Sequence, residues 1–288
     1  MKQDNITIVI PVYNEAESIE SCIRALRGQF PKTEIIVVDD GSEDQSAEIA
    51  ENAGARVVKH HKNSGYGASL KTGVRLVTTP YVVFCDGDGQ HSASDIARLI
   101  EITTPEHDMV VGVRTQTSHV SKRRWLGKTI LYHFANFLAD EKIPDFNSGL
   151  RVVKKEVLMK YFHLMPDGFS MSTTMTFAFL KSLRNIAWIP ITVVKRKGKS
   201  TVRQMKHGPQ TMLLMLRLTV LFEPLKVFLT VANFLFWLGL VSAVVNMALS
   251  GWQSIGKTTV IFCLASLMVF MFGLLCDQIS ALRREIHE

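Results

Sequence analysis

Three short polar segments of this chain contain carboxylates at spacings that could do chemistry. They are residues 11–15 (PVYNE), 39–42 (DDGS) and 86–91 (DGDGQH). In the third segment, Asp86 and Asp88 alternate with glycines and are followed by Gln90. Carboxylates and an amide carbonyl are hard oxygen ligands, suited to Mg²⁺ or Mn²⁺ bridging a diphosphate. An acidic turn of this length is also a common solvated loop, so its position in the fold decides its meaning.

Short apolar strands must position these segments. Apolar, β-branched runs predict strands at residues 6–10, 35–38, 57–59, 81–85 and 109–113. Helical spacing between them predicts helices at residues 15–27, 45–52, 67–77 and 94–103. This alternation is typical of an α/β domain with a Rossmann-like, mostly parallel sheet. Ligands of such sheets bind beyond the carboxyl ends of the strands, where all three carboxylate segments fall.

A glycine-rich segment, residues 63–68 (NSGYGA), precedes Lys71. Gly65 and Gly67 would permit close backbone approach to a phosphate, and the following helix N-terminus would favour an anion. The segment lacks the spacing of a P-loop or a dinucleotide fingerprint. An ordinary turn is the alternative interpretation.

The C-terminal third of the chain is markedly apolar. No Asp, Glu, Lys or Arg occurs from Val227 to Gly256, and after Lys257 none occurs until Asp277. The sequence predicts two membrane spans, at about residues 225–249 and 258–279, because about 20 apolar residues cross the hydrocarbon as a helix. Basic residues precede the first span and follow the second, whereas the connection at 250–256 contains no Lys or Arg. This asymmetry predicts that both termini, including the tail 282–288, lie in the cytoplasm.

Basic residues are also unevenly distributed before the hairpin. The net charge is +7, and residues 115–139 and 195–222 contain no acid. Apolar stripes at 121–139 and 205–223 favour amphipathic helices lying in the membrane interface, with core packing as the alternative. This charge suits anionic headgroups or phosphates, and no nucleic-acid-binding motif accompanies it. The four cysteines show no paired spacing, which predicts neither a disulfide nor a zinc site.

The ordered motifs resemble glycosyltransferase family 2 with the GT-A fold, specifically its dolichyl-phosphate mannose synthase-like branch. The resemblance covers about residues 6–204 and includes the four segments described above. Two further motifs contribute. Residues 147–151 (NSGLR) resemble the acceptor-side Ser-Gly-Phe-Arg motif, with Leu150 where Phe is usual, and residues 198–203 resemble a basic Gly-x-Ser loop. The implied domains are a catalytic domain at 1–204, a juxtamembrane helix at 205–223 and a hairpin at 224–281.

The resemblance implies a role for each matching residue. Nucleotide-sugar binding falls to Pro11, Tyr13, Glu15, Asp39, Asp40, Lys71 and Asp86. The metal ligands would be Asp86, Asp88 and Gln90. Phosphates of the donor or lipid would be bound by Arg124, Arg151, Lys199 and Arg203. The catalytic residues would be Asp88 and Arg151, together with Asp145. Its place just before the 147–151 turn, rather than the resemblance, makes Asp145 a candidate base or orienter of the acceptor, with capping of that turn as the alternative.

The expected reaction is a single inverting transfer of a hexosyl-type sugar from a UDP- or GDP-sugar to a polyprenyl phosphate, with Mg²⁺ or Mn²⁺. The expected setting is a multi-pass protein of a bacterial inner membrane, whose spans could also pack into a homo-oligomer. A processive polysaccharide synthase is one alternative, but its Gln-x-x-Arg-Trp motif is missing because Ser121 precedes Arg124-Trp125. A nucleotidyltransferase would begin with a glycine-rich, Lys-containing loop. An inactive membrane scaffold is the non-enzymatic alternative.

Overall fold

A computed structural model describes residues 3–114, 134–139, 142–193, 204–250 and 256–287. The chain forms two compact units, Met1–Met215 and Leu216–Glu288. The first unit contains the sheet and every carboxylate segment named above, and the second contains the apolar hairpin.

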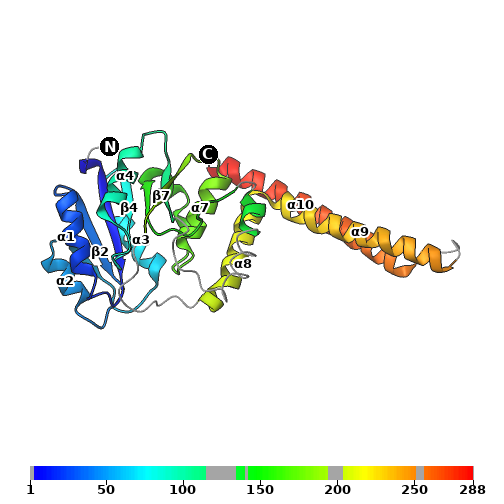
Figure 1. Cartoon of the computed structure of the whole chain (residues 1–288). Helices are drawn as coiled ribbons and strands as arrows, with labels where there is room; N and C mark the ends of the chain where they lie inside the picture. The colour runs from blue at the N-terminus through cyan, green and yellow to red at the C-terminus, as the bar shows by residue number, and fades with distance from the viewer. Residues whose placement is uncertain (1–2, 115–133, 140–141, 194–203, 251–255, 288) are drawn as a thin grey trace. The chain divides into compact units, whose positions relative to one another are not determined.

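Within the described residues, one mixed sheet of seven strands forms the centre of the first unit (Figure 1). In spatial order the strands are β3 (Arg56–Lys59), β2 (Glu34–Asp39), β1 (Ile6–Val12), β4 (Tyr81–Phe84), β6 (Arg151–Lys154), β5 (Met109–Arg114) and β7 (Ile186–Ile191). All neighbouring strands are parallel except β6, which runs antiparallel to both β4 and β5. The carboxyl ends of β2, β1 and β4 therefore lie together at one edge.

Helices cover both faces of this sheet. They are α1 (Ile19–Gln29), α2 (Ser46–Asn52), α3 (Tyr66–Leu76), α4 (Ala93–Ile102), α6 (Lys155–Lys160) and α7 (Met171–Lys181). Ile8 and Ile10 of β1 belong to a buried cluster with residues of α1 and α4, whereas Val9 faces Gly73 of α3. Because both faces of β1 are buried, its sequence is a continuous apolar run rather than an alternating one.

The five predicted strands and four predicted helices are confirmed, with shifts of a few residues at their ends. Strands β6 and β7 were missed. Strand β6 is only four residues long and begins within the 147–151 motif, and β7 contains Pro190. Proline is unfavourable in a sheet interior, and β7 is an edge strand, where proline is tolerated. The α/β fold with a mostly parallel sheet is confirmed.

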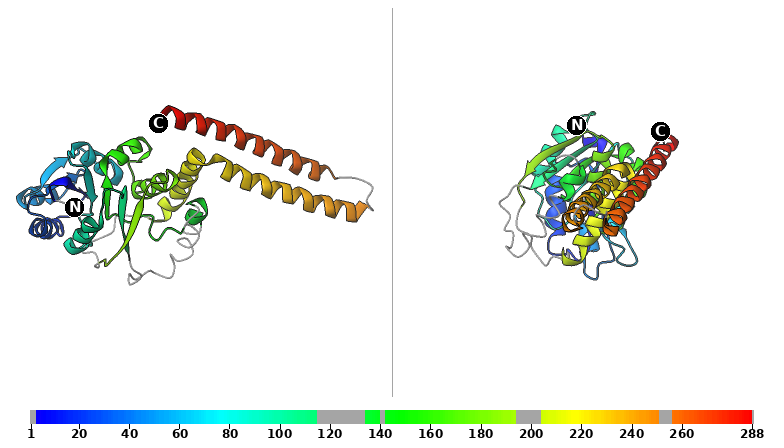
Figure 2. Two further views of the ribbon diagram at one scale, coloured as in Figure 1. Left: turned by 90° about the horizontal axis from the view of Figure 1, so that it is seen from above. Right: turned by 90° about the vertical axis from the view of Figure 1, so that its right-hand side faces the viewer.

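The second unit is a helical hairpin. Helix α8 (Gln204–Phe222) contains the division between the units, and α9 (Pro224–Ser250) and α10 (Lys257–His287) follow it. Figure 2 shows α9 and α10 running side by side. The Ser266 hydroxyl donates to the Ala232 carbonyl at 2.8 Å. Gly273 lies against Phe228, where an added β-carbon would be 2.6 Å from Cβ. Small residues thus let the two backbones approach, as in membrane helix pairs.

The predicted interfacial helix at 121–139 lies largely outside the described residues, of which 134–139 are helical. The predicted juxtamembrane helix at 205–223 corresponds to α8. The placement of both helices at a membrane interface stays a prediction.

Candidate active site

The loops after β1 and β2 are hydrogen-bonded into one unit. The Asn14 N–H donates to Ser42 Oγ at 2.9 Å, and the Glu43 N–H donates to Asn14 Oδ1 at 2.8 Å. Asn14 adopts φ 54°, a left-handed conformation that asparagine tolerates better than most residues. The predicted nucleotide-sugar ligands Pro11, Tyr13 and Glu15 are half-buried along this loop.

The adjacent carboxylates Asp39 and Asp40 have different surroundings. Both are 4% exposed. The oxygens of Asp39 lie 3.4 Å from the Ser42 N–H. Asp40 accepts the N–H groups of Ser64 and Gly65 at 2.9 and 2.8 Å, and its Oδ1 lies 2.7 Å from His60 Nδ1. These contacts make Asp40 the support of the glycine-rich segment, and they favour Asp39 as the carboxylate that meets a ligand.

The glycine-rich segment approaches protein backbone closely. Gly65 adopts φ 107°, and an added β-carbon there would lie 2.5 Å from the Asp167 carbonyl oxygen. At Gly67 a β-carbon would lie under 3.0 Å from the Pro166 carbonyl oxygen. The Ala68 N–H donates to Asp167 O at 3.0 Å. The glycines therefore make room for the chain at 166–168, and the phosphate contact suggested by the sequence stays a prediction.

Lys71 belongs to the same contact region. Its ammonium group forms an ion pair with Asp167 and donates to the Met165 carbonyl at 3.2 Å. The Lys71 side chain is 16% exposed. These contacts tie α3 to the segment before α7. The nucleotide-binding role of Lys71 stays a prediction.

The predicted metal motif follows β4. Asp86 Oδ1 accepts the Tyr66 hydroxyl at 3.1 Å, and Oδ2 lies 3.6 Å from His91 Nε2. Burial opposes ionisation, yet His91 and Tyr66 lower the pKa of Asp86 below its ordinary value. Asp88 Oδ1 accepts the Gln90 N–H at 3.1 Å. Burial and the charge of Asp86 raise the pKa of Tyr66 well above its ordinary value, so its hydroxyl remains a donor.

This motif suits a cation shared with a substrate. Among the residues that the structure describes, no three His, Cys, Asp or Glu side chains cluster as a complete metal site. Mg²⁺ is commonly bound through one or two carboxylates together with substrate phosphates. Asp86 and Asp88 are the carboxylates predicted for this role, and the lowered pKa of Asp86 favours its ionised form.

The 147–151 motif directly contacts the metal motif. A β-carbon on Gly149 would lie under 3.0 Å from Asp86 Oδ2. A β-carbon at this position would require the turn or the Asp86 carboxylate to move. The geometry therefore brings the predicted acceptor-side motif and the predicted metal motif into contact.

An ion pair that the residue pattern did not predict lies beside this turn. The Arg114 guanidinium binds Asp145 through both carboxylate oxygens, at 2.7 and 2.8 Å, and also donates to Asn147. Although burial opposes the charge, Asp145 raises the pKa of Arg114. Arg114 ends strand β5, directly before a basic segment, and a cation at a strand's carboxyl end could have drawn attention to it.

Arg151 is 1% exposed and is surrounded by oxygens of the protein itself. It donates to the carbonyls of Ser148 and Ser172 and to Thr176 Oγ1. Burial lowers the pKa of Arg151 to about 10. These contacts favour a positioning role that joins the 147–151 turn to α7, and its contact with a substrate phosphate stays a prediction. Arg124, Lys199 and Arg203 lie outside the described residues.

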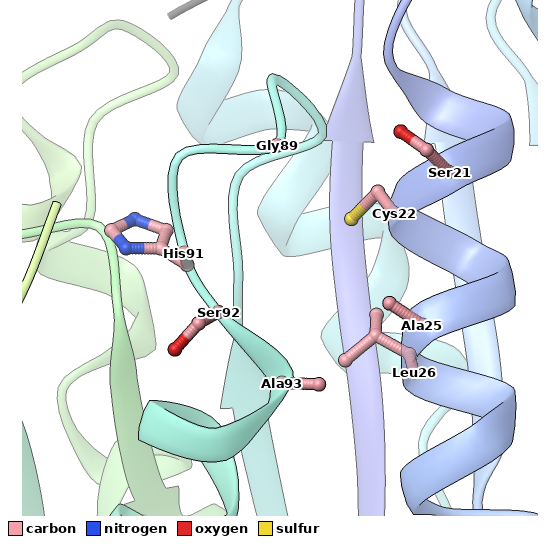
Figure 3. A pocket seen from close by; sticks show the side chains of 8 residues that line it. All are labelled: Ser21, Cys22, Ala25, Leu26, Gly89, His91, Ser92 and Ala93. Atoms are coloured by element: carbon pink, nitrogen blue, oxygen red, sulfur yellow. The ribbon is translucent and has the colours of Figure 1, made fainter. Parts of the chain in front are cut away.

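A hollow of about 310 Å³ lies between α1 and the loop leading into α4 (Figure 3). It is lined by Ser21, Cys22, Ala25, Leu26, Gly89, His91, Ser92 and Ala93. Figure 3 shows the His91 ring directed away from Ser21 and Cys22. The lining contains no carboxylate and no Lys or Arg, so this hollow does not have the polar groups of a nucleotide-sugar site.

The sheet and its strand-end carboxylates define a glycosyltransferase domain of the GT-A type. Residues 7–162 match glycosyl transferase family 2, and the chain belongs to that family. Residues 223–282 match the GtrB C-terminal hairpin.

Relatives agree with this assignment. Glycosyltransferase AglJ of Haloferax volcanii is 29% identical over 294 residues, covering 98% of this chain and 96% of AglJ. The undecaprenyl-phosphate 4-deoxy-4-formamido-L-arabinose transferase of Pectobacterium carotovorum is 31% identical over 169 residues. That match covers 55% of this chain and 51% of the relative, so the similarity spans only about half of either protein.

A solved structure shares the fold. Glucosyl-3-phosphoglycerate synthase of Mycobacterium tuberculosis, in complex with Mn²⁺, UDP and phosphoglyceric acid, superposes with a TM-score of 0.63 at 20% identity. The match covers 75% of this chain and 78% of that chain.

The hairpin has the properties of a membrane anchor. Segments Pro224–Leu249 and Lys257–Leu282 are each 26 residues long, with mean hydropathies of 2.1 and 2.5. Only 11% of each apolar window is buried within the protein, unlike the core helices of a soluble domain. Together with the hairpin match, this identifies a membrane-anchored glycosyltransferase.

Proposed function

We propose that the protein transfers one hexosyl-type sugar from a UDP- or GDP-sugar to a polyprenyl phosphate, with inversion and with Mg²⁺ or Mn²⁺, at the cytoplasmic face of a membrane. The observation that carries this proposal is the contact between Gly149 and Asp86, which joins the acceptor-side motif to the metal motif. The exposed apolar hairpin supports a lipid acceptor. The named function of the Pectobacterium relative also supports undecaprenyl phosphate.

The donor side of the proposed site is the edge formed by β2, β1 and β4. Pro11, Tyr13, Glu15 and Asp39 hold the base and ribose. Asp40 and Lys71 contribute to the donor site indirectly. Asp40 holds the glycine-rich segment in place, and Lys71 holds the segment that contains Asp167. A divalent cation bound by Asp86, Asp88 and Gln90 would offset the charge of the departing nucleoside diphosphate.

The acceptor phosphate must be oriented by the protein, but it does not need a strong general base. A lipid monophosphate is largely anionic near neutral pH, so its oxygen can attack the anomeric carbon without first losing a proton to the protein. Both oxygens of Asp145 are already bound by Arg114. We therefore infer that this pair orients the acceptor, while Arg124, Lys199 and Arg203 bind phosphates. A single displacement of this kind inverts the anomeric configuration.

The decisive experiment uses full-length protein in nanodiscs with a polyprenyl phosphate. A panel of UDP- and GDP-sugars is offered with Mn²⁺ or Mg²⁺, and nucleoside diphosphate release is followed with and without the lipid. Lipid-dependent release from one donor, with a single sugar on the lipid, is expected. Long saccharide products would indicate a processive synthase, and no release with any donor would indicate a scaffold.

The metal motif can be tested in the same assay. Asp88→Ala is expected to abolish turnover, because it removes a ligand of the cation, while membrane association remains. A near-normal rate for this variant would contradict the proposed metal site.

A further inference from the structure

We propose that the Tyr66 hydroxyl positions the Asp86 carboxylate for metal binding, and that residues 165–169 hold the Tyr66 ring in place. Tyr66 is thus a positioning residue rather than a ligand. The inference rests on the proposed function, because the metal-binding role of Asp86 belongs to it.

The Asp86 carboxylate is contacted from three directions. Tyr66 donates to Oδ1 at 3.1 Å, His91 Nε2 lies 3.6 Å from Oδ2, and the Gly149 backbone lies against the same oxygen. The Asp86 side chain is still 33% exposed, so these contacts do not enclose it. One hydrogen bond to Oδ1 leaves further acceptor capacity on both oxygens. The carboxylate is therefore oriented and also accessible to a cation.

The Tyr66 ring is itself fixed by the segment before α7. It stacks on Phe169 with ring centroids 5.8 Å apart and an angle of 16° between the planes. Because Gly65 and Gly67 lack side chains, this segment lies directly on the start of α3. The Ala68 N–H bond to Asp167 holds the two segments together. The Lys71 ion pair with the same residue does so from the next turn of α3.

This arrangement gives a structural reason for the glycines of segment 63–68. Its glycines admit residues 166–168, and those residues place the aromatic ring that reaches Asp86. Carboxylates that bind metals are usually hydrogen-bonded by a second layer of residues, and loss of such a partner typically weakens metal affinity by about 10- to 100-fold. Tyr66 has the geometry of such a partner.

The test is Mn²⁺ binding to full-length protein in nanodiscs with UDP or GDP present, measured by electron paramagnetic resonance. Tyr66→Phe removes the hydroxyl but keeps the stacked ring, and about tenfold weaker Mn²⁺ binding is expected. Phe169→Leu keeps the hydroxyl but loosens the ring, and a smaller weakening is expected. Tyr161→Phe is the matched control, because it also removes a tyrosine hydroxyl. That hydroxyl accepts hydrogen bonds from Arg184 at 3.2 and 3.3 Å rather than contacting Asp86. The Mn²⁺ affinity of this variant should equal that of the wild type.

The outcomes separate this inference from the proposed function. Wild-type Mn²⁺ affinity in Tyr66→Phe would overturn the role of Tyr66 and leave the proposed function intact. Equal weakening in Tyr161→Phe would also overturn it, since the effect would then be a general one. A wild-type protein that binds no Mn²⁺ with either UDP or GDP would overturn the metal role of Asp86 itself, and this inference with it.

Discussion

Gly149 shows how closely two motifs can constrain each other at the scale of a single residue. Its α-carbon lies where any side chain would meet the Asp86 carboxylate. Either the turn or the carboxylate would have to move to make room for a side chain. Because transfer geometry is sensitive to displacements of about 1 Å, even a methyl group at this position should matter.

We expect Gly149→Ala to lower kcat/KM by at least about tenfold while the protein stays folded, because the methyl group displaces Asp86. Steady-state kinetics and thermal unfolding would measure the two effects. Gly28→Ala is the matched control. Gly28 lies in α1 with nothing within 4 Å of an added β-carbon, so this substitution should add about 0.5–1 kcal/mol of stability and leave activity unchanged. Unaltered kinetics in Gly149→Ala would contradict the contact.

Substitutions in the Arg114–Asp145 pair can distinguish orientation of the acceptor from general-base catalysis. Asp145→Asn keeps one acceptor oxygen but breaks the bidentate ion pair, so we expect kcat/KM to fall by about 10- to 100-fold with the shape of its pH profile preserved. Arg114→Lys should show a similar loss, since lysine cannot form the paired contacts. Measurements of kcat/KM from acid to alkaline pH would test both variants. Loss of the acid limb in Asp145→Asn alone would instead identify a general base.

Residue types and spacing indicate which segments form the candidate site. They say less about the role of each side chain in it. Asp39 and Asp40 are neighbours in sequence, but only the folded chain shows that Asp40 is occupied by the Ser64 and Gly65 amides. Arg151 is predicted to bind a phosphate, and only the folded chain shows that its guanidinium group is buried among carbonyls. These differences arise from contacts between residues far apart in sequence, which local spacing does not encode.

At the scale of elements, the contact between α3 and residues 165–169 links the two sides of the site. Asp167 is 65% exposed and Lys71 is 16% exposed, so their ion pair is only partly shielded from solvent. An exposed pair contributes about 0.2–1 kcal/mol. Its larger effect should therefore be on position rather than on stability.

A double-mutant cycle separates this structural role of Lys71 from nucleotide binding. We expect Lys71→Met and Asp167→Ala to weaken UDP binding by similar factors, and the double variant to be little worse than either, because both remove one contact. Titration calorimetry with UDP and Mn²⁺ would measure the affinities. If only Lys71→Met weakened binding, Lys71 would be a direct ligand of the nucleotide.

The hairpin allows a separate prediction about packing. Gly273→Leu should lower the thermal midpoint of the hairpin unit in nanodiscs by several degrees, because its side chain would displace Phe228. Ala248→Leu places a leucine at an exposed position of α9 and should have little effect. Equal midpoints for the two variants would argue against close contact at Gly273.

The hydrophobic pattern predicted the elements that are apolar along their whole length. It missed the strands whose place in the sheet is determined by pairing with neighbouring strands. The continuous apolar runs of β1, β2 and β4 and the apolar lengths of α9 and α10 were evident from sequence. Strand β6 lies antiparallel between two parallel strands, and nothing within its four residues specifies that direction. The sheet's second half therefore depends on tertiary pairing.

At the scale of the whole molecule, the chain divides into a catalytic unit and a hairpin unit. Removing the residues after Phe222 should release much of the protein from membranes and weaken transfer to a long-chain lipid, because the hairpin supplies the anchoring surface. Membrane fractionation and turnover with long- and short-chain polyprenyl phosphates would measure these effects. Unchanged retention and an unchanged long-chain rate would contradict the anchoring role.

The packing of residues 166–168 onto Gly65 and Gly67 also has a consequence for biosynthesis. The glycine segment leaves the ribosome long before its partner segment is made, so it cannot reach its final conformation while only the first strands are present. Strand β6, which fills the place between β4 and β5, likewise arrives after both. Long-range pairing of this kind slows folding. The nascent protein therefore cannot acquire a complete site before residues 166–168 and strand β6 have been synthesised.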